Sequence, residues 1–134
     1  MTGRVLLVVA AALFDAKGRV LLAQRPAGKS LAGLWEFPGG KLEPGETPEA
    51  ALARELEEEL SIRVNESQIQ PMTFASFGYP DFHLLMPLYG CETWMGDIRP
   101  REGQAVAWVE TSRLRDYPAP PADLPLFDWL ARRN

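Results

Sequence analysis

Gly40 to Ile62 reads GKLEPGETPEAALARELEEELSI, and this stretch decides the fold and the chemistry of the 134-residue chain. A turn rich in glycine and proline leads into a predicted helix with Thr47 as its N-cap and Pro48 at its first position, which both residues favour. The helix is expected to run to about Leu60. The face that it buries is expected to carry Ala53, Leu56 and Leu60.

The second half of this predicted helix crowds acids at Glu55, Glu57, Glu58 and Glu59. Residues three and four apart share a helix face, so Glu55, Glu58 and Glu59 point the same way. Such like charges repel by about a few tenths of a kcal/mol per pair, and near a helix C-terminus they also oppose the macrodipole. A hard divalent cation reverses this cost, because it prefers carboxylate oxygens. The pattern therefore predicts a metal site, with Mg²⁺ as the expected ion and Mn²⁺ as the alternative.

The stretch resembles the Nudix box of the Nudix hydrolases. That motif is Gly, five residues, Glu, seven residues, Arg-Glu, an aliphatic residue, any residue, Glu-Glu, any residue, Gly and a final aliphatic residue. Ser61 stands where the family has Gly, and a left-handed C-cap costs Ser about 1 kcal/mol more than Gly. Every charged position of the motif is present. The matching residues are Gly40, Glu46, Arg54, Glu55, Leu56, Glu58, Glu59 and Ile62.

Composition and charge agree with a compact enzyme. Nearly half of the residues are apolar, so residues 1–134 are expected to form one domain and to act as a monomer. The net charge of -4 argues against binding to nucleic-acid polymers or membranes. Cys91 is the only cysteine, which excludes an intrachain disulfide and favours a reducing, cytoplasmic location. Cys91 is expected to be a small strand residue and not a catalytic thiol.

The apolar run from Val5 to Phe14 has two interpretations. Its length and the preceding Arg4 are typical of a signal-peptide core. The same run also reads as a fully buried strand, followed by a turn at residues 15–18. We favour the strand, because removal of this run would delete a strand of the only expected domain. The run is too short to span a bilayer.

Six strands are predicted around one main helix. Strands on both sides of a helix favour an α/β (α+β) fold, and the family resemblance implies a Nudix-type α/β/α sandwich with a mixed β-sheet. A short helical turn is expected after Thr111, and a C-terminal helix from about Leu124. The predicted strands are Val5–Phe14, Val20–Gln24, Trp35–Phe37, Met72–Phe77, His83–Glu92 and Ala105–Glu110.

The resemblance extends beyond the motif to the MutT branch of the family, the pyrophosphohydrolases that cleanse the nucleotide pool. Relatives that hydrolyse cytidine triphosphate share the same features almost as well. The stretches that carry this likeness are Gln24–Pro26, Leu34–Gly40, Arg101–Gln104, Ala107–Trp108 and Tyr117–Pro125.

The family resemblance implies the roles of the metal-site residues. Glu55, Glu58 and Glu59 would hold one or more divalent ions, joined by the backbone carbonyl of Gly39. Glu102 would swing in as a further ligand or as the base that activates water, although a loop acid exposed to solvent is the alternative. Gly39 and Gly40 have no Cβ, so their backbone can approach metal and phosphates.

Four charged residues are expected to support these carboxylates. Glu46 and Arg54 are expected to pair with each other and to orient the ligands, together with Gly40. Arg25 and Lys41 are candidates to neutralise phosphate, and Arg suits a bidentate grip. Lys41 reads equally well as an ordinary surface lysine.

The reaction class follows from what the sequence contains. His83 is the only histidine and lies in an apolar predicted strand, so it is expected to be structural and no Ser-His-Asp arrangement exists. The sequence has no P-loop and no dinucleotide-binding glycine pattern. Carboxylates, metal and cationic side chains suit metal-assisted attack of water on phosphorus. The resemblance implies a nucleoside monophosphate and pyrophosphate as products.

Selectivity for the base is less sharply predicted. An apolar slot for stacking is expected from Phe37, Phe77, Tyr79 and Phe82, any of which also suits a core. Asp123 stands where the best-known MutT member has Asn, and an ionised carboxylate only accepts hydrogen bonds. Asp123 reads equally well as a helix N-cap. Oxidised dGTP is the favoured substrate, with CTP and 5-substituted dCTP close behind.

Two other functions stay open. One is a different Nudix substrate, a dinucleoside polyphosphate or ADP-ribose, because Tyr79 lies seventeen residues past the motif. The other is a non-catalytic nucleotide-binding or regulatory module. Such a module would be expected to have lost carboxylates of the metal site, and all of them are present.

Overall fold

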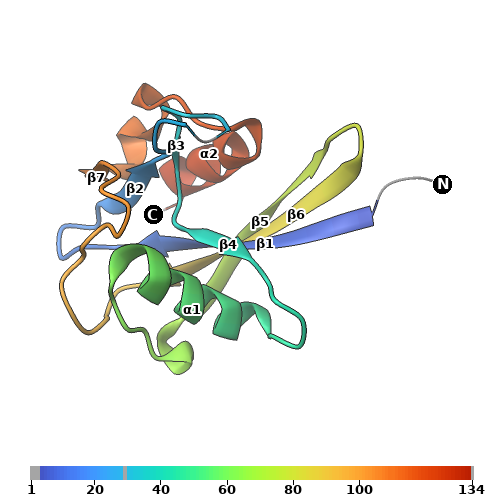
Figure 1. Ribbon diagram of the computed structural model, residues 1–134. Coiled ribbons are helices and arrows are strands. Elements are labelled where there is room, and N and C mark those ends of the chain that lie inside the picture. Colours follow the sequence, from blue (N-terminus) through green and yellow to red (C-terminus); the bar gives the residue numbers. More distant parts are fainter. Residues whose placement is uncertain (1–3, 29, 134) are drawn as a thin grey trace.

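The computed structural model describes residues 4–28 and 30–133, which fold into strands flanked by two α-helices (Figure 1). The elements in chain order are β1 (Arg4–Leu13), β2 (Val20–Gln24), β3 (Trp35–Glu36), β4 (Gly39–Lys41), α1 (Pro48–Leu60), η1 (Glu66–Gln68), β5 (Gln70–Gly78), β6 (Phe82–Cys91), β7 (Val106–Val109), η2 (Thr111–Asp116), η3 (Pro121–Asp123) and α2 (Leu124–Arg132).

The strands form two sheets. The larger sheet has the order β4-β1-β6-β5, and within it β1 and β6 are parallel while the other pairs are antiparallel. The smaller sheet has the order β3-β2-β7 and is antiparallel. The expected α+β fold with a mixed sheet is confirmed.

The two helices cover opposite faces of β1, with α1 below and α2 above in Figure 1. Side chains alternate between the faces of a strand, and those of β1 divide accordingly. Val9, Ala11 and Leu13 belong to the core cluster that contains the buried face of α1. Ala10 and Ala12 belong to the cluster that contains the buried face of α2. The layers are therefore helix, strands and helix, as the family resemblance implied.

The N-terminal apolar run forms β1 and lies between β4 and β6. Because both faces of this strand are covered by helices, its inner half is a continuous run of buried apolar residues. The strand predicted at Val5–Phe14 is therefore present, one residue earlier along the chain, as β1. None of the described helices is long and apolar enough to cross a membrane.

Helix α1 begins and ends where it was predicted. Thr47 accepts a hydrogen bond from the backbone N–H of Ala50 at 3.1 Å, and Pro48 is the first helical residue. The predicted buried face is wrong at one position, since Ala53 is only half-buried. The fully buried stripe repeats every fourth residue and carries Leu52, Leu56 and Leu60, beside Ala51.

The structure contains one strand that was not predicted. Residues 39–41 form β4, although Gly-Gly-Lys has low strand propensity. This segment becomes a strand because it pairs with β1 on the side away from β6. The 3-10 turns η1 and η3 were not predicted either, whereas η2 is the turn that was expected after Thr111.

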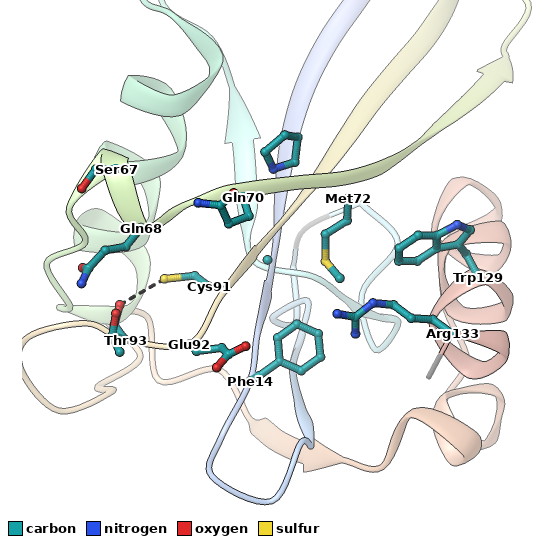
Figure 2. A pocket seen from close by; sticks show the side chains of 12 residues that line it. Phe14, Ser67, Gln68, Gln70, Met72, Cys91, Glu92, Thr93, Trp129 and Arg133 are labelled. Carbon is teal, nitrogen blue, oxygen red and sulfur yellow. Dashed lines mark hydrogen bonds between the residues drawn. The ribbon is translucent and has the colours of Figure 1, made fainter.

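Cys91 and His83 occupy structural positions. The Cys91 thiol is buried, donates to the backbone oxygen of Thr93 at 3.1 Å, and has a pKa raised by burial (Figure 2). A raised pKa opposes thiolate formation, so the thiol is not activated as a nucleophile. His83 lies on β6, and its Nε2 is 2.6 Å from the hydroxyl oxygen of Ser76 on β5.

Candidate active site

The acidic face of α1 lies beside β4. Leu56 and Leu60 are buried in the core, so the side chains of the residues between them point away from the core. Glu55 and Glu59 are half-buried there, and Glu58 is exposed. The i, i+3 and i, i+4 spacing therefore places the three predicted carboxylates on neighbouring parts of one face.

Two glycines allow β4 to fit between β1 and this acidic face. Gly39 and Gly40 pair with Ala10 and Val9 of β1. A Cβ on Gly39 would overlap the backbone oxygen of Val9, and a Cβ on Gly40 would overlap the carboxylate of Glu55. Any larger residue would displace either the strand or the carboxylate, so the close approach requires glycine.

Arg54 joins the loop before α1 to the acids on the helix. Its Nε and one terminal nitrogen donate to Glu46 at 2.7 and 2.9 Å, so the predicted pair is present and bidentate. The other terminal nitrogen lies 3.2 Å from both Glu55 and Glu58. The backbone oxygen of Lys41 accepts a further bond at 3.0 Å. The hydrogen bonds from Arg54 and from a backbone N–H lower the pKa of Glu46 to about 2.

Glu59 is held close to other carboxyl groups. Burial raises its pKa well above the ordinary value, and a hydrogen bond with Glu55 and the charges of Glu55 and Glu36 raise it further. A backbone hydrogen bond with Gly39 acts in the opposite direction. Negative charge on the Glu59 carboxyl is therefore disfavoured unless a cation lies beside it.

Glu36 on β3 is paired with Arg25, which follows β2. Arg25 Nη1 lies 3.0 Å from Glu36, and Arg25 Nε donates to the backbone oxygen of Ser30 at 2.7 Å. Burial raises the pKa of Glu36, and the Arg25 guanidinium opposes that rise. The charge of Glu36 acts on both Glu59 and Asp123. Glu36 thus lies between the acidic face of α1 and the segment that was predicted to read the base.

Asp123 occupies the N-cap position of α2, as one of the two hypotheses expected, but its side chain does not cap the helix. Its backbone is helical and its side chain makes no capping hydrogen bond to α2. Its carboxylate accepts from the backbone N–H of Phe37 at 3.3 Å instead, and the residue is only 5% exposed. Burial, together with the charge of Glu36, raises the pKa of Asp123 to about 7.

Glu102 lies on an exposed turn after the strands of the larger sheet. Its backbone N–H donates to the side-chain oxygen of Gln104 at 3.0 Å. Glu102 and Arg25 line the same cleft of about 700 Å³, at which Gln24, Ala32 and Gly103 also lie. The cleft therefore brings together the predicted phosphate-binding arginine and the predicted mobile carboxylate.

The four aromatic residues predicted as one stacking slot divide into two groups. Phe37 is 4% exposed and packs edge-to-face against Phe127 of α2, with ring centres 5.4 Å apart. Its ring is therefore part of the core. Tyr79 packs against both Phe77 and Phe82 at 4.9 Å, where β5 turns into β6. This second group is half-buried and retains accessible surface.

A separate cavity of about 640 Å³ opens where β1 and β6 end, beside the start of β5 and the end of α2 (Figure 2). Phe14, Met72 and Trp129 form its apolar wall, and Glu92 and Arg133 supply opposite charges. It contains none of the predicted site residues. The candidate site is therefore the acidic face of α1 and the adjoining cleft.

The comparison with known proteins agrees with this geometry. The profile of the NUDIX domain family matches residues 9–129, which is most of the chain. The chain belongs to the Nudix family. It is a hydrolase, like the curated members that it matches.

Two curated Nudix relatives are equally similar to the chain. The CTP pyrophosphohydrolase of Escherichia coli strain K12 is 37% identical over 90% of this chain and 87% of its own length. The 8-oxo-dGTP diphosphatase of Haemophilus influenzae is 37% identical over 97% of this chain and 94% of its own length. The solution structure of the E. coli ORF135 protein is 35% identical and superimposes with a TM-score of 0.82, covering 94% of this chain and 88% of that one.

The helix of the Nudix motif ends at its C-cap Ser61, the one position that departs from the family pattern. Ser61 has φ 65° and ψ 22°, the left-handed conformation that the motif glycine adopts freely. Its backbone N–H still donates to the oxygen of Glu57 at 3.1 Å. The helix therefore ends as expected, at a cost of about 1 kcal/mol to Ser.

The carboxyl pair on α1 fits a divalent metal, on which Nudix hydrolases generally depend. The charge of Glu55 helps to raise the pKa of Glu59, and a divalent cation beside the two carboxylates would favour the ionised form of Glu59. Glu58 instead accepts from Arg54, and Glu102 lines the cleft that Arg25 also lines. Within residues 4–28 and 30–133 no three acidic, His or Cys side chains already form a closed metal-binding group. Glu58 and Glu102 would therefore have to turn toward the pair.

Glu36 is the charged residue of this Nudix site that sequence reasoning passed over. Glu36 pairs with Arg25, and its negative charge helps to raise the pKa of both Glu59 and Asp123. The available signal was an acid between two aromatic residues in a predicted strand. Lys41 is exposed at the end of β4, and its contact with the site is through its backbone oxygen.

Proposed function

We propose that this Nudix hydrolase cleaves nucleoside and deoxynucleoside triphosphates to the nucleoside monophosphate and pyrophosphate, with Mg²⁺ as its metal and Mn²⁺ as a substitute. The observation that carries the proposal is the close pair of half-buried carboxyl groups of Glu55 and Glu59, held beside Gly39 and Gly40. Two neighbouring carboxylates that are partly removed from water are costly unless a cation compensates their charges. The names of the two curated relatives support the nucleotide class.

Each residue of the site has a role in this proposal. When bound, the metal polarises the phosphoryl oxygens and lowers the pKa of the attacking water. Glu55 and Glu59 hold it, and Arg54 keeps their carboxylates oriented through Glu46. Arg25 faces the cleft and neutralises phosphate charge. Glu102 enters from the opposite side of the cleft and either completes the ligand set or accepts the proton of the water.

The proposed preferred substrate is an oxidised guanine nucleotide such as 8-oxo-dGTP. Asp123 is buried beside the backbone N–H of Phe37, and its pKa of about 7 means that a substantial fraction carries a proton at neutral pH. A protonated carboxyl donates as well as accepts. A protonated Asp123 can therefore both donate and accept, as an amide does, and is not limited to base edges that donate. The half-buried Tyr79 and Phe82 are the proposed stacking residues.

The second candidate is a cytosine nucleotide, CTP or 5-substituted dCTP. It is favoured by the relative named CTP pyrophosphohydrolase, which is as similar to the chain as the 8-oxo-dGTP diphosphatase. An ionised Asp123 would accept from the exocyclic amino group of cytosine. The two candidates therefore differ in the protonation of one buried carboxyl group.

The test is release of pyrophosphate and monophosphate from a nucleotide panel, with and without Mg²⁺ or Mn²⁺. The panel contains 8-oxo-dGTP, dGTP, CTP, 5-methyl-dCTP, a dinucleoside tetraphosphate and ADP-ribose. We expect the highest kcat/KM for 8-oxo-dGTP and no turnover without metal. A preference for the last two substrates, or turnover in the presence of chelator, would contradict the proposal.

We also propose that the protein acts as a monomer on free nucleotides in the cytoplasm, without binding nucleic-acid polymers. The net charge of -4 and the single, buried Cys91 support this. Light scattering at micromolar concentration tests the monomer, and a gel-shift assay with single-stranded and double-stranded DNA tests the second part.

A further inference from the structure

Ser61 makes side-chain contacts that the motif glycine cannot make. Its hydroxyl donates to the backbone oxygen of Arg99 at 3.1 Å and accepts from Nε of Arg101 at 2.9 Å. Residues 99–101 are separated from Ser61 by about forty positions and belong to the loop between β6 and β7. The hydroxyl therefore joins the end of α1 to a distant loop.

The backbone of the same loop caps the last turn of α1. The N–H of Arg99 donates to the oxygen of Leu60 at 2.8 Å, and the N–H of Arg101 donates to the oxygen of Glu59 at 2.9 Å. The final carbonyl groups of a helix have no partner within the helix. The loop supplies two of these partners, and Ser61 adds two side-chain hydrogen bonds at the same place.

Glu102 follows the last anchored residue directly. The N–H of Gly103 donates to the oxygen of Pro100 at 3.4 Å, so residues 100–103 form a tight turn with Glu102 near its tip. The hold on Arg101 against α1 therefore acts on Glu102 through one peptide unit, alongside the hydrogen bond from Glu102 to Gln104. Arg101 is held by one backbone hydrogen bond to Glu59 and one side-chain hydrogen bond to Ser61.

We propose that Ser61 is a positioning residue that anchors the Glu102 turn to the end of the metal-binding helix. The proposal rests on the proposed function for its kinetic consequence, because Glu102 acts there on the far side of the cleft. Ser61 adopts a left-handed backbone conformation that is unfavourable for serine. Its hydroxyl restricts the motion of residues 99–101 through two hydrogen bonds. A glycine would end the helix more easily and would leave the turn with two fewer hydrogen bonds.

The test compares Ser61→Gly and Ser61→Ala with the wild-type chain. Gly relieves the left-handed backbone and Ala retains it, so an effect common to both variants comes from the hydroxyl. The matched control is Ser67→Ala, which removes an exposed hydroxyl on η1 that bonds Asn65. The first measurement is amide hydrogen exchange of Arg101 without nucleotide. We expect roughly two- to tenfold faster exchange in both Ser61 variants, the range of one or two ordinary hydrogen bonds, and no change in the control.

The second measurement is steady-state kinetics on 8-oxo-dGTP with Mg²⁺, in the wild-type and Glu102→Gln backgrounds. We expect kcat to fall roughly two- to tenfold in both Ser61 variants with KM unchanged. In the Glu102→Gln background the Ser61 substitutions should cause no further loss, because the anchor then has no catalytic group to position. Rate losses that multiply in the double variants, or unchanged exchange at Arg101, would overturn the inference.

The outcome also separates this inference from the proposed function. Faster exchange at Arg101 in both variants of a wild-type chain that releases no pyrophosphate would support the anchor and overturn the proposed function. Full nucleotide hydrolysis with unchanged exchange and kcat would support the proposed function and overturn the anchor.

Discussion

Glu59 belongs to the Nudix motif, is half-buried and lies close to the carboxyl groups of Glu55 and Glu36. The substitution Glu59→Gln keeps the shape of the side chain and removes the charge that would hold a metal. We expect kcat to fall by at least about a hundredfold, since metal stabilisation of the transition state supplies several kcal/mol, with an unchanged circular dichroism spectrum. The kcat of Glu58→Gln should also fall. Glu57→Gln, on the exposed side of the helix, is the control and should keep its activity. Full activity of purified, folded Glu59→Gln would contradict the metal-site assignment.

Asp123 offers a test of base selection that is free of any capping effect. Its carboxyl bonds Phe37 and makes no capping bond to α2, so Asp123→Asn should leave the helix intact. If Asp123 reads the base, the ratio of kcat/KM between 8-oxo-dGTP and CTP should change roughly ten- to a hundredfold, equivalent to about 1–3 kcal/mol. Steady-state kinetics on both nucleotides measures the ratio. An unchanged ratio would leave base selection to other residues.

At the scale of elements, Arg54 connects the loop of residues 41–46 with α1. Arg54→Lys keeps the charge and loses the bidentate geometry with Glu46, which Lys cannot reproduce. We expect metal affinity to fall roughly ten- to a hundredfold, the usual effect of removing a group that orients ligands. Titration of Mn²⁺ followed by electron paramagnetic resonance measures this affinity. Arg63→Lys is the control, because the Arg63 side chain is exposed and lies 4.0 Å from the exposed Glu57. Equal loss in both variants would mean a nonspecific effect.

At the scale of the whole molecule, divalent metal should stabilise the fold. The carboxyl groups of α1 meet only in the folded chain, so a metal at a hundred times its Kd adds about 2.7 kcal/mol to the free energy of unfolding. Differential scanning calorimetry should show Tm rising by several degrees with Mg²⁺ in wild-type protein and little in Glu59→Gln. Because the pKa of Glu59 is raised, protons compete with metal for its carboxylate, so the shift should grow as pH rises. A Tm that does not respond to Mg²⁺ or Mn²⁺ would mean that the acidic face is merely solvated.

The buried Asp123 also gives stability a dependence on pH. Its pKa is about 7 in the folded chain and near 3.8 when unfolded, so the folded state binds more protons between these values. The stability linked to this group is fully present below about pH 4 and is lost as pH rises to about 7. In Asp123→Asn the free energy of unfolding should fall less over this range than in wild-type protein. Urea unfolding at pH 4.5, 6 and 7.5 tests this, and parallel pH curves for the two proteins would contradict it.

Features that depend on near neighbours in the chain were readable from the sequence alone. Thr47 and Pro48 set the start of α1, and the spacing of Glu55, Glu58 and Glu59 sets a shared face, because helix geometry relates residues within four positions. β2 was predicted with its observed bounds, since a short apolar run between turns is a local signal. The Nudix motif is likewise one continuous stretch, so the family and the reaction class followed from it.

Features that join distant parts of the chain were decided only by the tertiary structure. β4 exists because Gly39 and Gly40 fit between β1 and Glu55, and their own strand propensity would not predict it. Asp123 stands at the N-cap position of α2, but its carboxylate bonds a backbone N–H 86 positions away and does not cap the helix. Glu36 links Glu59 to Asp123, and Ser61 holds a loop some forty positions away, through contacts that no local pattern encodes. Local sequence determined which carboxylates this protein has, and packing determined which of them are buried with a raised pKa and what holds them in place.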